Sequence, residues 1–365
     1  MTAPAVIDLD DAEGLLAADR QGLLRAASMA GAQVRATASA LGEGELDAVR
    51  SDSPPRTVVW VAGRGSAVTA GSMLAAVLSG TLPAPMVVAT AAPPWIGALD
   101  VLIVAGDDPG DPTLVSAAAT GVRRGARVVV VAPYEGPLRD ATAGRSVALP
   151  PRLPVPEDFT LARYLAAGLA ALEVIAPGVR VDLSALADEL DAEAFRNSAA
   201  RDVFTNPAKD LTQRMVGRDV VFAGDTPATL TLARHACTVM LRVAQKTAAA
   251  AGLADVLVAV GAGWGRAGAQ DASIFHDEEI DGPLPQRART IVLTSDADRP
   301  AISARLRGFD DVSVVNANDV PEVGRVGEEE PGSTATPGDN RPEQQLAMLA
   351  VRLEMAAVYQ RLIRG

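Results

Sequence analysis

The chain has 365 residues, a length typical of about two domains. Hydrophobic residues make up 48% and charged residues 21%, as in ordinary globular proteins, but aromatic residues only 3%. The core must therefore be built from Ala, Val and Leu, and the chain lacks the stacking side chains that binders of single-stranded nucleic acid use. The formal net charge of −12 also repels phosphate backbones, so we expect no nucleic-acid partner.

The first residues are acidic, with Asp8, Asp10 and Asp11, and they do not form a signal peptide. The nearly uncharged stretch 247–264 is mostly Ala and Gly, so we interpret it as a helix end followed by a buried strand, not as a membrane span. Cys237 is the only cysteine, which excludes an intramolecular disulfide and any multi-cysteine metal site. We expect a cytoplasmic protein with no cofactor and no metal.

Short apolar runs alternate with helical patterns in the first half, which predicts an α/β fold with a parallel sheet covered by helices. An amphipathic stretch over 12–41 predicts one leading helix or two. The predicted strands are Thr57–Ala62, Met86–Ala89, Val101–Ala105 and Arg127–Val131, and the predicted helices are Ala67–Leu78 and Thr113–Arg124. Four prolines between 150 and 156 predict an irregular segment, so we divide the chain into domains 1–155 and 156–365.

The second half repeats this alternation after two predicted helices over 159–174 and 182–197. The predicted strands are Asp219–Ala223, Val256–Val260, Thr290–Leu293 and Val312–Val315, with helices over Pro227–Ala250 and Pro300–Gly308. Residues 322–342 are rich in Gly, Pro, Glu, Ser and Thr, which predicts a flexible loop. A closing helix is predicted over 343–363, with its leucines near one face.

A glycine turn follows the first predicted strand, in the order Gly63-Arg64-Gly65-Ser66. Glycines at the start of a helix let backbone amides approach an anion. A dinucleotide fingerprint would need glycine where the chain has Val68, and the lysine of a phosphate-binding Walker loop is missing. The pattern indicates either a site for a small phosphorylated or hydroxylated ligand or a simple tight turn.

Three aspartates follow the third predicted strand, namely Asp107, Asp108 and Asp111. Loops at the carboxyl ends of parallel strands form the ligand crevice of open α/β sheets. The aspartates could therefore hold a cation or the hydroxyl groups of a sugar. Asp, Pro and Gly are also the residues that ordinary turns use, so a turn is the alternative.

A third cluster lies at 276–281, where four carboxylates stand beside His276, one of only two histidines. Neighbouring like charges raise each other's proton affinity, which favours acid–base chemistry. The alternative is a solvated acidic loop. The other histidine, His235, lies in an Ala/Leu-rich helical pattern and is predicted to be a packing residue.

The second half carries 206–209, a strand over 220–223 followed by Gly224, a helix with Arg242 and the acidic cluster. In this order it resembles tandem sugar isomerase (SIS) domain proteins, most closely the bifunctional phosphoglucose/phosphomannose isomerase branch. The resemblance implies two flavodoxin-like parallel-sheet domains in tandem, with helices on both faces, and a homodimer. It places the catalytic glutamate on Glu279, with Glu278 as the alternative and His276 assisting. The substrate-binding residues that we predict are Gly63, Arg64, Gly65, Ser66, Asp107, Asp108, Gly224, Thr226 and Arg242.

The chain departs from the family at two places. Family members bind phosphate with a Ser/Thr-rich second loop, where this chain has Asp107 and Asp108, and a carboxylate repels a phosphate dianion. The family's catalytic lysine beyond the last helix has no counterpart, because no lysine follows Lys246. Two hypotheses remain: an isomerase that converts glucose 6-phosphate or mannose 6-phosphate to fructose 6-phosphate, or an inactive sensor, regulatory or scaffolding subunit. In a scaffolding role, the closing amphipathic helix would be the natural interface.

Overall fold

The computed structural model describes residues 7–176, 178–264, 287–309, 311–319 and 341–364. The chain forms two compact units. The first unit spans 25–194, and the second unit combines 1–24 with 195–365. This division differs from the predicted boundary between 155 and 156, because the helices after the proline-rich segment group with the first sheet.

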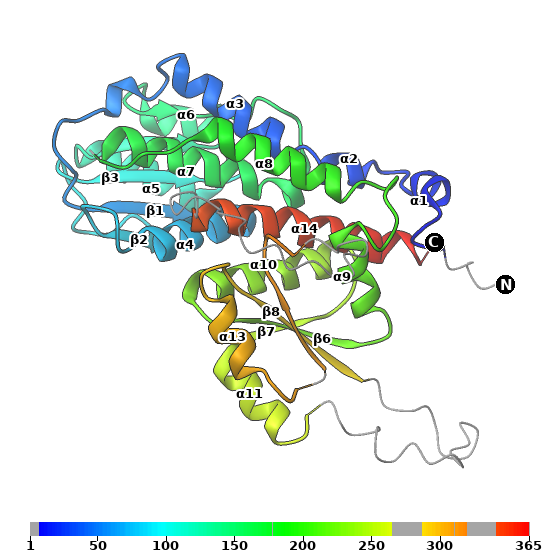
Figure 1. Ribbon diagram of the computed structural model, residues 1–365. Coiled ribbons are helices and arrows are strands. Elements are labelled where there is room, and N and C mark those ends of the chain that lie inside the picture. Colours follow the sequence, from blue (N-terminus) through cyan, green and yellow to red (C-terminus); the bar gives the residue numbers. More distant parts are fainter. Residues whose placement is uncertain (1–6, 177, 265–286, 310, 320–340, 365) are drawn as a thin grey trace, which may run out of the picture. The chain divides into compact units, whose positions relative to one another are not determined.

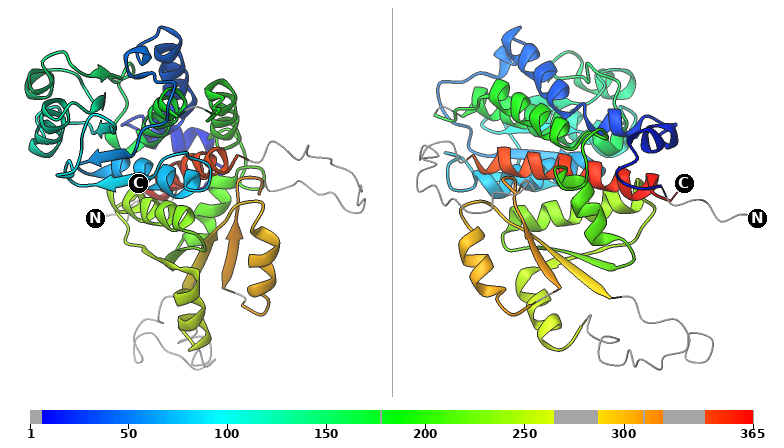
Figure 2. Two further views of the ribbon diagram at one scale, coloured as in Figure 1. Left: turned by 90° about the vertical axis from the view of Figure 1, so that its left-hand side faces the viewer. Right: turned by 45° about the vertical axis from the view of Figure 1, so that its right-hand side comes forward.

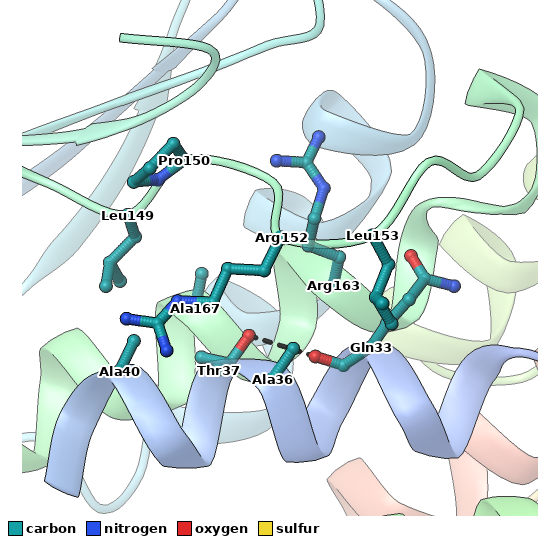
Figure 3. Close-up of a pocket in the computed structure, with 10 residues that line it drawn as sticks. All are labelled: Gln33, Ala36, Thr37, Ala40, Leu149, Pro150, Arg152, Leu153, Arg163 and Ala167. Atoms are coloured by element: carbon teal, nitrogen blue, oxygen red, sulfur yellow. Dashed lines mark hydrogen bonds between the residues drawn. The ribbon is translucent and has the colours of Figure 1, made fainter. Parts of the chain in front are cut away.

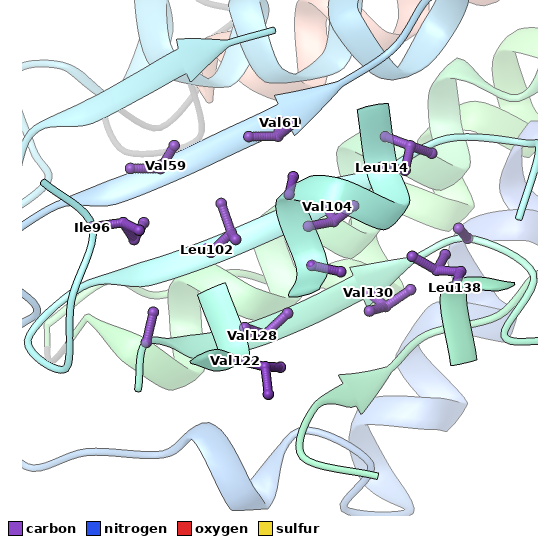
Figure 4. Close-up of a cluster of buried hydrophobic side chains, with 14 residues drawn as sticks. Val59, Val61, Ile96, Leu102, Val104, Leu114, Val122, Val128, Val130 and Leu138 are labelled. Atoms are coloured by element: carbon purple, nitrogen blue, oxygen red, sulfur yellow. The ribbon is translucent and has the colours of Figure 1, made fainter. Parts of the chain in front are cut away.

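The first unit contains a five-stranded parallel sheet in the order β2-β1-β3-β4-β5 (Figure 1). Its strands are β1 (Val58–Ala62), β2 (Met86–Ala89), β3 (Val101–Ala105), β4 (Arg127–Val131) and the short β5 (Val147–Ala148). Every residue of β1 and β3 is buried, as the uninterrupted apolar runs predict. Alternate side chains of the central strands pack with those of the following helices into a valine- and leucine-rich core (Figure 4).

Helices cover both faces of this sheet, as expected. The helices of this unit are α2 (Leu23–Ala27), α3 (Ala30–Gly42), α4 (Gly65–Leu78), α5 (Pro112–Arg123), α6 (Gly136–Thr142), α7 (Leu161–Ile175) and α8 (Leu183–Arg196), of which α2 and α8 extend across the boundaries of the unit. Leu114 of α5 and Leu138 of α6 belong to the core on one face. On the other face Trp60 is fully buried and donates its indole hydrogen to the carbonyl of Ala67 at 2.9 Å. Helix α7 packs on α3 and α4, and this packing places it in the first unit.

The second unit contains a four-stranded parallel sheet in the order β7-β6-β8-β9. Its strands are β6 (Asp219–Gly224), β7 (Ala249–Gly252), β8 (Ala288–Leu293) and β9 (Val312–Val315), and its helices are α1 (Ala12–Ala18), α9 (Pro207–Met215), α10 (Pro227–Arg242), α11 (Leu253–Gly261), α13 (Arg299–Arg305) and α14 (Pro342–Leu362). Helix α10 lies between the sheet and α14, whereas α11 and α13 pack on the opposite face (Figure 2).

The predicted strand over Val256–Val260 is wrong, because these residues belong to helix α11. Val256 and Val260 are buried while Val258 is 74% exposed, which is the spacing of a helix face and not of a buried strand. The actual strand, β7, has the sequence Ala-Ala-Ala-Gly and carries no β-branched residue. The prediction of one helix or two over 12–41 is also wrong, because that stretch contains the three helices α1, α2 and α3. Gly22 has a φ of +65° and separates the first from the second.

The closing helix α14 is not amphipathic. Every residue from Gln345 to Gln360 is buried, including Arg352, and the helix packs on α9 and α10 within the second unit. Among the described residues, no helix is both long and apolar enough to cross a membrane.

Candidate functional site

The carboxyl ends of β1 and β3 form the candidate site. The two strands are paired in parallel register, with Ala62 beside Ala105, so the loops that follow them emerge next to each other. From this point the sheet continues to β2 on one side and to β4 on the other. Such a point, where the strand order reverses, is where open α/β sheets bind their ligands. The two predicted clusters, at 63–66 and at 107–108, are thus brought together.

The β1 loop leaves the start of helix α4 open. Arg64 is the N-cap residue, and no side-chain hydrogen bond caps the helix. Gly65 adopts a φ of +65°, and a Cβ there would meet nothing within 4 Å, so the backbone is uncovered. The Arg64 side chain is 72% exposed, and its guanidinium lies 3.5 Å from Glu157 Oε2. Ser66 Oγ donates to the carbonyl of Glu157 at 3.4 Å.

Each aspartate of the β3 loop has a partner within the first unit. Asp111 caps α5 by accepting the Thr113 amide hydrogen at 2.8 Å, and Asp108 accepts the Gly110 amide hydrogen at the same distance. These bonds are those of a turn followed by a capped helix, as the alternative interpretation predicts. Asp107 instead forms an ion pair, and its side chain remains 29% exposed.

The partner of Asp107 is Arg163 of α7, which the sequence analysis missed. Arg163 is buried, and its Nη2 donates to Asp107 Oδ1 at 2.8 Å. The guanidinium also lies over the ring of Tyr164, 4.2 Å from the ring centre. Its Nε and Nη1 atoms are buried without a hydrogen-bond partner in the described chain. A charged residue inside an Ala/Leu-rich helix is the signal in the sequence that could have identified it.

Arg163 lines a small pocket behind the loops, between α3, α7 and the segment after β5 (Figure 3). Gln33 and Thr37 form its α3 side, and Thr37 Oγ1 donates to the carbonyl of Gln33 at 3.2 Å. The carboxamide nitrogen of Gln33 donates to the carbonyl of Phe159, while its Oε1 is buried without a partner in the described chain. The pocket, of about 20 Å³, has room for about one water molecule and none for a sugar.

Gly224 and Thr226 lie at the corresponding edge of the second sheet, where they have structural roles. A Cβ on Gly224 would stand 2.2 Å from the amide nitrogen of Leu230, so glycine is required by the close approach of α10. Thr226 caps α10 through a reciprocal capping box with Thr229. The start of this helix is therefore closed by its own side chains.

Arg242 does not join Gly224 and Thr226. It is the last of the 16 residues of α10, so it stands at the other end of that helix, about 22 Å along the axis. The sequence analysis placed it among the binding residues on the strength of the resemblance. Within the second unit, the helix geometry separates it from that edge.

The predicted catalytic residues His276, Glu278 and Glu279 lie outside the described residues. His235 lies inside them, and it is a buried packing residue, as predicted. Its Nε2 is 3.0 Å from Glu354 Oε1, and both side chains are almost completely buried.

Both lysines of the chain form hydrogen bonds within the second unit. Lys209 is fully buried, and its Nζ donates to the carbonyls of Ala199 at 2.9 Å and Arg201 at 2.6 Å. Burial lowers the pKa of the Lys209 ammonium. Lys246 Nζ donates to the side-chain oxygen of Gln360, and burial lowers its pKa too.

The charges at the β1–β3 edge are mixed. The cations are Arg64 and Arg163, and the anions are Asp107, Asp108, Asp111 and Glu157. Backbone amides and Arg64 on one loop suit an anion, and carboxylates on the other suit hydroxyl groups. Among the ranges that the structure describes, no three His, Cys, Asp or Glu side chains are grouped to hold a metal ion.

No model of a known protein family matches the sequence, and neither does any curated protein. Solved structures do match. A tagatose-6-phosphate ketose/aldose isomerase from Escherichia coli aligns with a TM-score of 0.59 at 15% identity, covering 100% of this chain and 95% of that one. A glucose-6-phosphate isomerase like protein from Thermus thermophilus gives 0.52 at 22% identity, with 98% and 94% covered. A glucosamine-6-phosphate deaminase from Thermotoga maritima gives 0.58 at 9% identity, with 94% and 95% covered.

These likenesses extend over almost the whole of this chain and of each matched chain. They confirm the expected fold, two parallel α/β units in tandem as in the sugar isomerase proteins. At these identities the likeness is one of fold, so what the chain binds has to be argued from its own residues.

Proposed function

We propose that this chain binds a phosphosugar or another sugar derivative at the carboxyl edge of β1 and β3. The observation that carries the proposal is the open start of α4, where no side chain caps the helix and Arg64 stands exposed beside it. The strand order also reverses at this edge, and open α/β sheets bind their ligands at such points. The structural neighbours whose names refer to sugar phosphates give the proposal independent support.

The phosphate group is placed at α4 and not at α5. The first turn of α4 offers unpaired amide hydrogens and the positive end of the helix dipole, about half an elementary charge. Arg64 adds a guanidinium that can hold two phosphate oxygens. At α5 the same position is already taken by the carboxylate of Asp111, which would repel a phosphate.

The sugar hydroxyl groups are placed toward Asp107 and Asp108. A carboxylate accepts hydrogen bonds from neighbouring hydroxyls, and Asp107 keeps part of its surface exposed although it is paired with Arg163. Arg163 fixes the orientation of Asp107 and offsets its charge. The acidic loop, which argues against phosphate binding at that place, thereby supports hydroxyl binding next to it.

Binding is tested by titrating fructose 6-phosphate into the protein and into two arginine variants. Arg64→Ala is expected to weaken affinity about tenfold, the value of one lost charge-assisted contact. The matched control is Arg123→Ala, an exposed arginine at the opposite end of α5. Unchanged affinity in Arg64→Ala, or equal loss in both variants, would contradict the proposal.

The proposal has two forms, a catalytic one in which the bound sugar is isomerised and a non-catalytic one in which it is only bound. In an isomerase, Glu279 would move a proton between C1 and C2 of the open-chain sugar, with Glu278 as the alternative and His276 assisting. The non-catalytic alternative, a sensor or regulatory subunit, is favoured by two observations. Both lysines are used in structural hydrogen bonds, and Asp107 and Asp108 stand where the family has hydroxyl donors.

Coupled assays with glucose 6-phosphate and mannose 6-phosphate decide between these two. An isomerase converts them to fructose 6-phosphate and loses that activity in Glu279→Gln but not in the neighbouring Asp277→Asn. A regulatory protein binds the sugar phosphate without turnover in any variant. We also propose a cytoplasmic homodimer, and a monomer in light scattering would contradict the dimer.

A further inference from the structure

A large hollow lies at the other end of the second unit, away from the carboxyl edge of its sheet. It measures about 680 Å³, and it is formed by the segment after α1, the loop after α10 and the last turn of α14. Figure 1 shows α1 beside the C-terminal end of α14, and the two helices are in contact. Helix α10 starts at the carboxyl end of β6 and the next strand begins at Ala249, so the loop at 243–246 lies at the amino edge of the sheet.

Three arginines line this hollow in a chain whose net charge is −12. They are Arg20, Arg361 and Arg364. Arg20 and Arg364 are exposed, and within the described chain neither forms an ion pair. Arg361 donates one guanidinium hydrogen to the carbonyl of Val243 at 3.3 Å, which holds it at the wall.

Asp19 is the one carboxylate in the described lining, and both of its oxygens accept backbone hydrogen bonds. Its two oxygens accept the amide hydrogens of Leu23 at 2.8 Å and Leu24 at 2.9 Å, at the start of α2. It therefore does not neutralise the arginines by direct pairing.

Two further features mark the same place. Lys246 follows the lining residue Gln245 directly, and the pKa of Lys246 is lowered first by burial and then by the charge of Arg364. Gln245 itself has a φ of +53°, a conformation that strains a residue with a side chain. Residues with a strained backbone are frequent at ligand sites. The Gln245 side chain is exposed at the rim of the hollow.

We propose that this hollow binds a phosphorylated small molecule of nucleotide size. Guanidinium groups match the geometry of phosphate oxygens, and three of them suit a diphosphate or triphosphate. Apolar side chains, among them Leu23 and Leu362, provide a wall for the body of the molecule. The volume lies within the range of about 300 to 1,000 Å³ that is typical of small-molecule sites. The site is separate from the proposed sugar site and does not depend on it.

The test is a calorimetric titration with ADP, with pyrophosphate as a competitor. Removing two guanidiniums in the double variant Arg20→Ala/Arg364→Ala is expected to weaken ADP binding about a hundredfold, about tenfold for each. The matched control Arg305→Ala/Arg307→Ala removes the same charge from exposed positions in and after α13. It is expected to bind ADP as the unmodified chain does, and pyrophosphate is expected to displace ADP.

Three results would overturn the inference. They are no heat of ADP binding at millimolar concentration, equal affinity in the Arg20/Arg364 variant and the unmodified chain, and equal loss in the control. Thermal unfolding of each variant without ligand checks that it is folded. ADP binding that is lost in Arg64→Ala would assign the nucleotide to the β1–β3 edge and would also overturn the inference.

Discussion

The carboxyl edges of the two sheets are built alike but are closed differently. In both units a strand ends in glycine or alanine and leads into a long helix, α4 in the first unit and α10 in the second. Helix α10 is capped by Thr226, and Gly224 is pressed against its backbone. Helix α4 has no capping side chain, and Gly65 faces open space.

The same strand–glycine–helix pattern is thus completed in two different ways. In the second unit the glycine allows close packing, and threonine hydroxyls satisfy the helix start. In the first unit no side chain caps the start of α4, and Arg64 stands beside it; we propose that the free amide donors there bind a ligand. A glycine–hydroxyl pattern in the sequence therefore indicates a site only where the structure leaves the helix start unsatisfied.

Among the variants that test this difference, the largest loss of stability is expected for Gly224→Ala. The new methyl group would meet backbone atoms of Thr229 and Leu230, which cannot move aside, so we expect a loss of about 3 kcal/mol in the free energy of unfolding. The matched change Gly63→Ala meets only the side chain of Asp111 and costs about 1 kcal/mol, the value of the α5 cap. Urea denaturation measures both. Equal costs would contradict the contrast between a packed edge and an open one.

A smaller effect is expected for Arg163→Met, which removes the ion pair that holds Asp107. The variant keeps most of the buried volume but leaves a half-buried carboxylate unpaired, at a cost of about 2 kcal/mol. Affinity for fructose 6-phosphate should fall as well, because Asp107 loses its fixed orientation. The double variant Arg163→Met/Asp107→Asn should recover part of the stability but not the affinity. Recovery of both would show that the pair has no part in binding.

Thr226→Ala is expected to cost about 1 kcal/mol through loss of the α10 cap. Its affinity for sugar phosphate should remain that of the unmodified chain, because this helix start is closed by its own residues. Parallel urea denaturation and calorimetry measure the two quantities. A loss of affinity with unchanged stability would assign Thr226 to the binding site and remove the difference between the two edges.

The smallest effect concerns reactivity inside α10. Burial raises the pKa of the Cys237 thiol from 9.0 to about 11, which lowers its thiolate fraction at neutral pH about a hundredfold. Alkylation by iodoacetamide should therefore be slow in the native protein, and its rate should keep rising with pH well above 9. In urea the rate should level off at lower pH. Identical pH profiles would indicate that α10 is not packed as described.

Much of the fold could be predicted because its signals are local. The valine runs of β1, β3 and β4 and the turns after them identify the first sheet. Strand β7 was missed because three alanines and a glycine carry no strand signal. The division into two compact units differs from the predicted boundary, because α7 groups with the first sheet through its packing on α3 and α4, which lie far from it in the sequence.

The candidate site was predictable in part. Parallel strands place their carboxyl ends together, so the loops after β1 and β3 could be expected to meet. Arg163 could not be found in this way, because it lies 56 residues from Asp107 and the pair forms only through packing. Thr226 looked like a ligand residue, since a capping hydroxyl and a binding hydroxyl have the same appearance in a sequence.

The central claim is that phosphate binds at the start of α4. It is tested most directly by the amide chemical shifts of the labelled protein during titration with fructose 6-phosphate. The account predicts the largest shifts at the amides of Gly65 and Ser66, with little change at Thr226 and Thr229. Largest shifts at Thr226 and Thr229, or none at Gly65 and Ser66 while ligand binds, would contradict it.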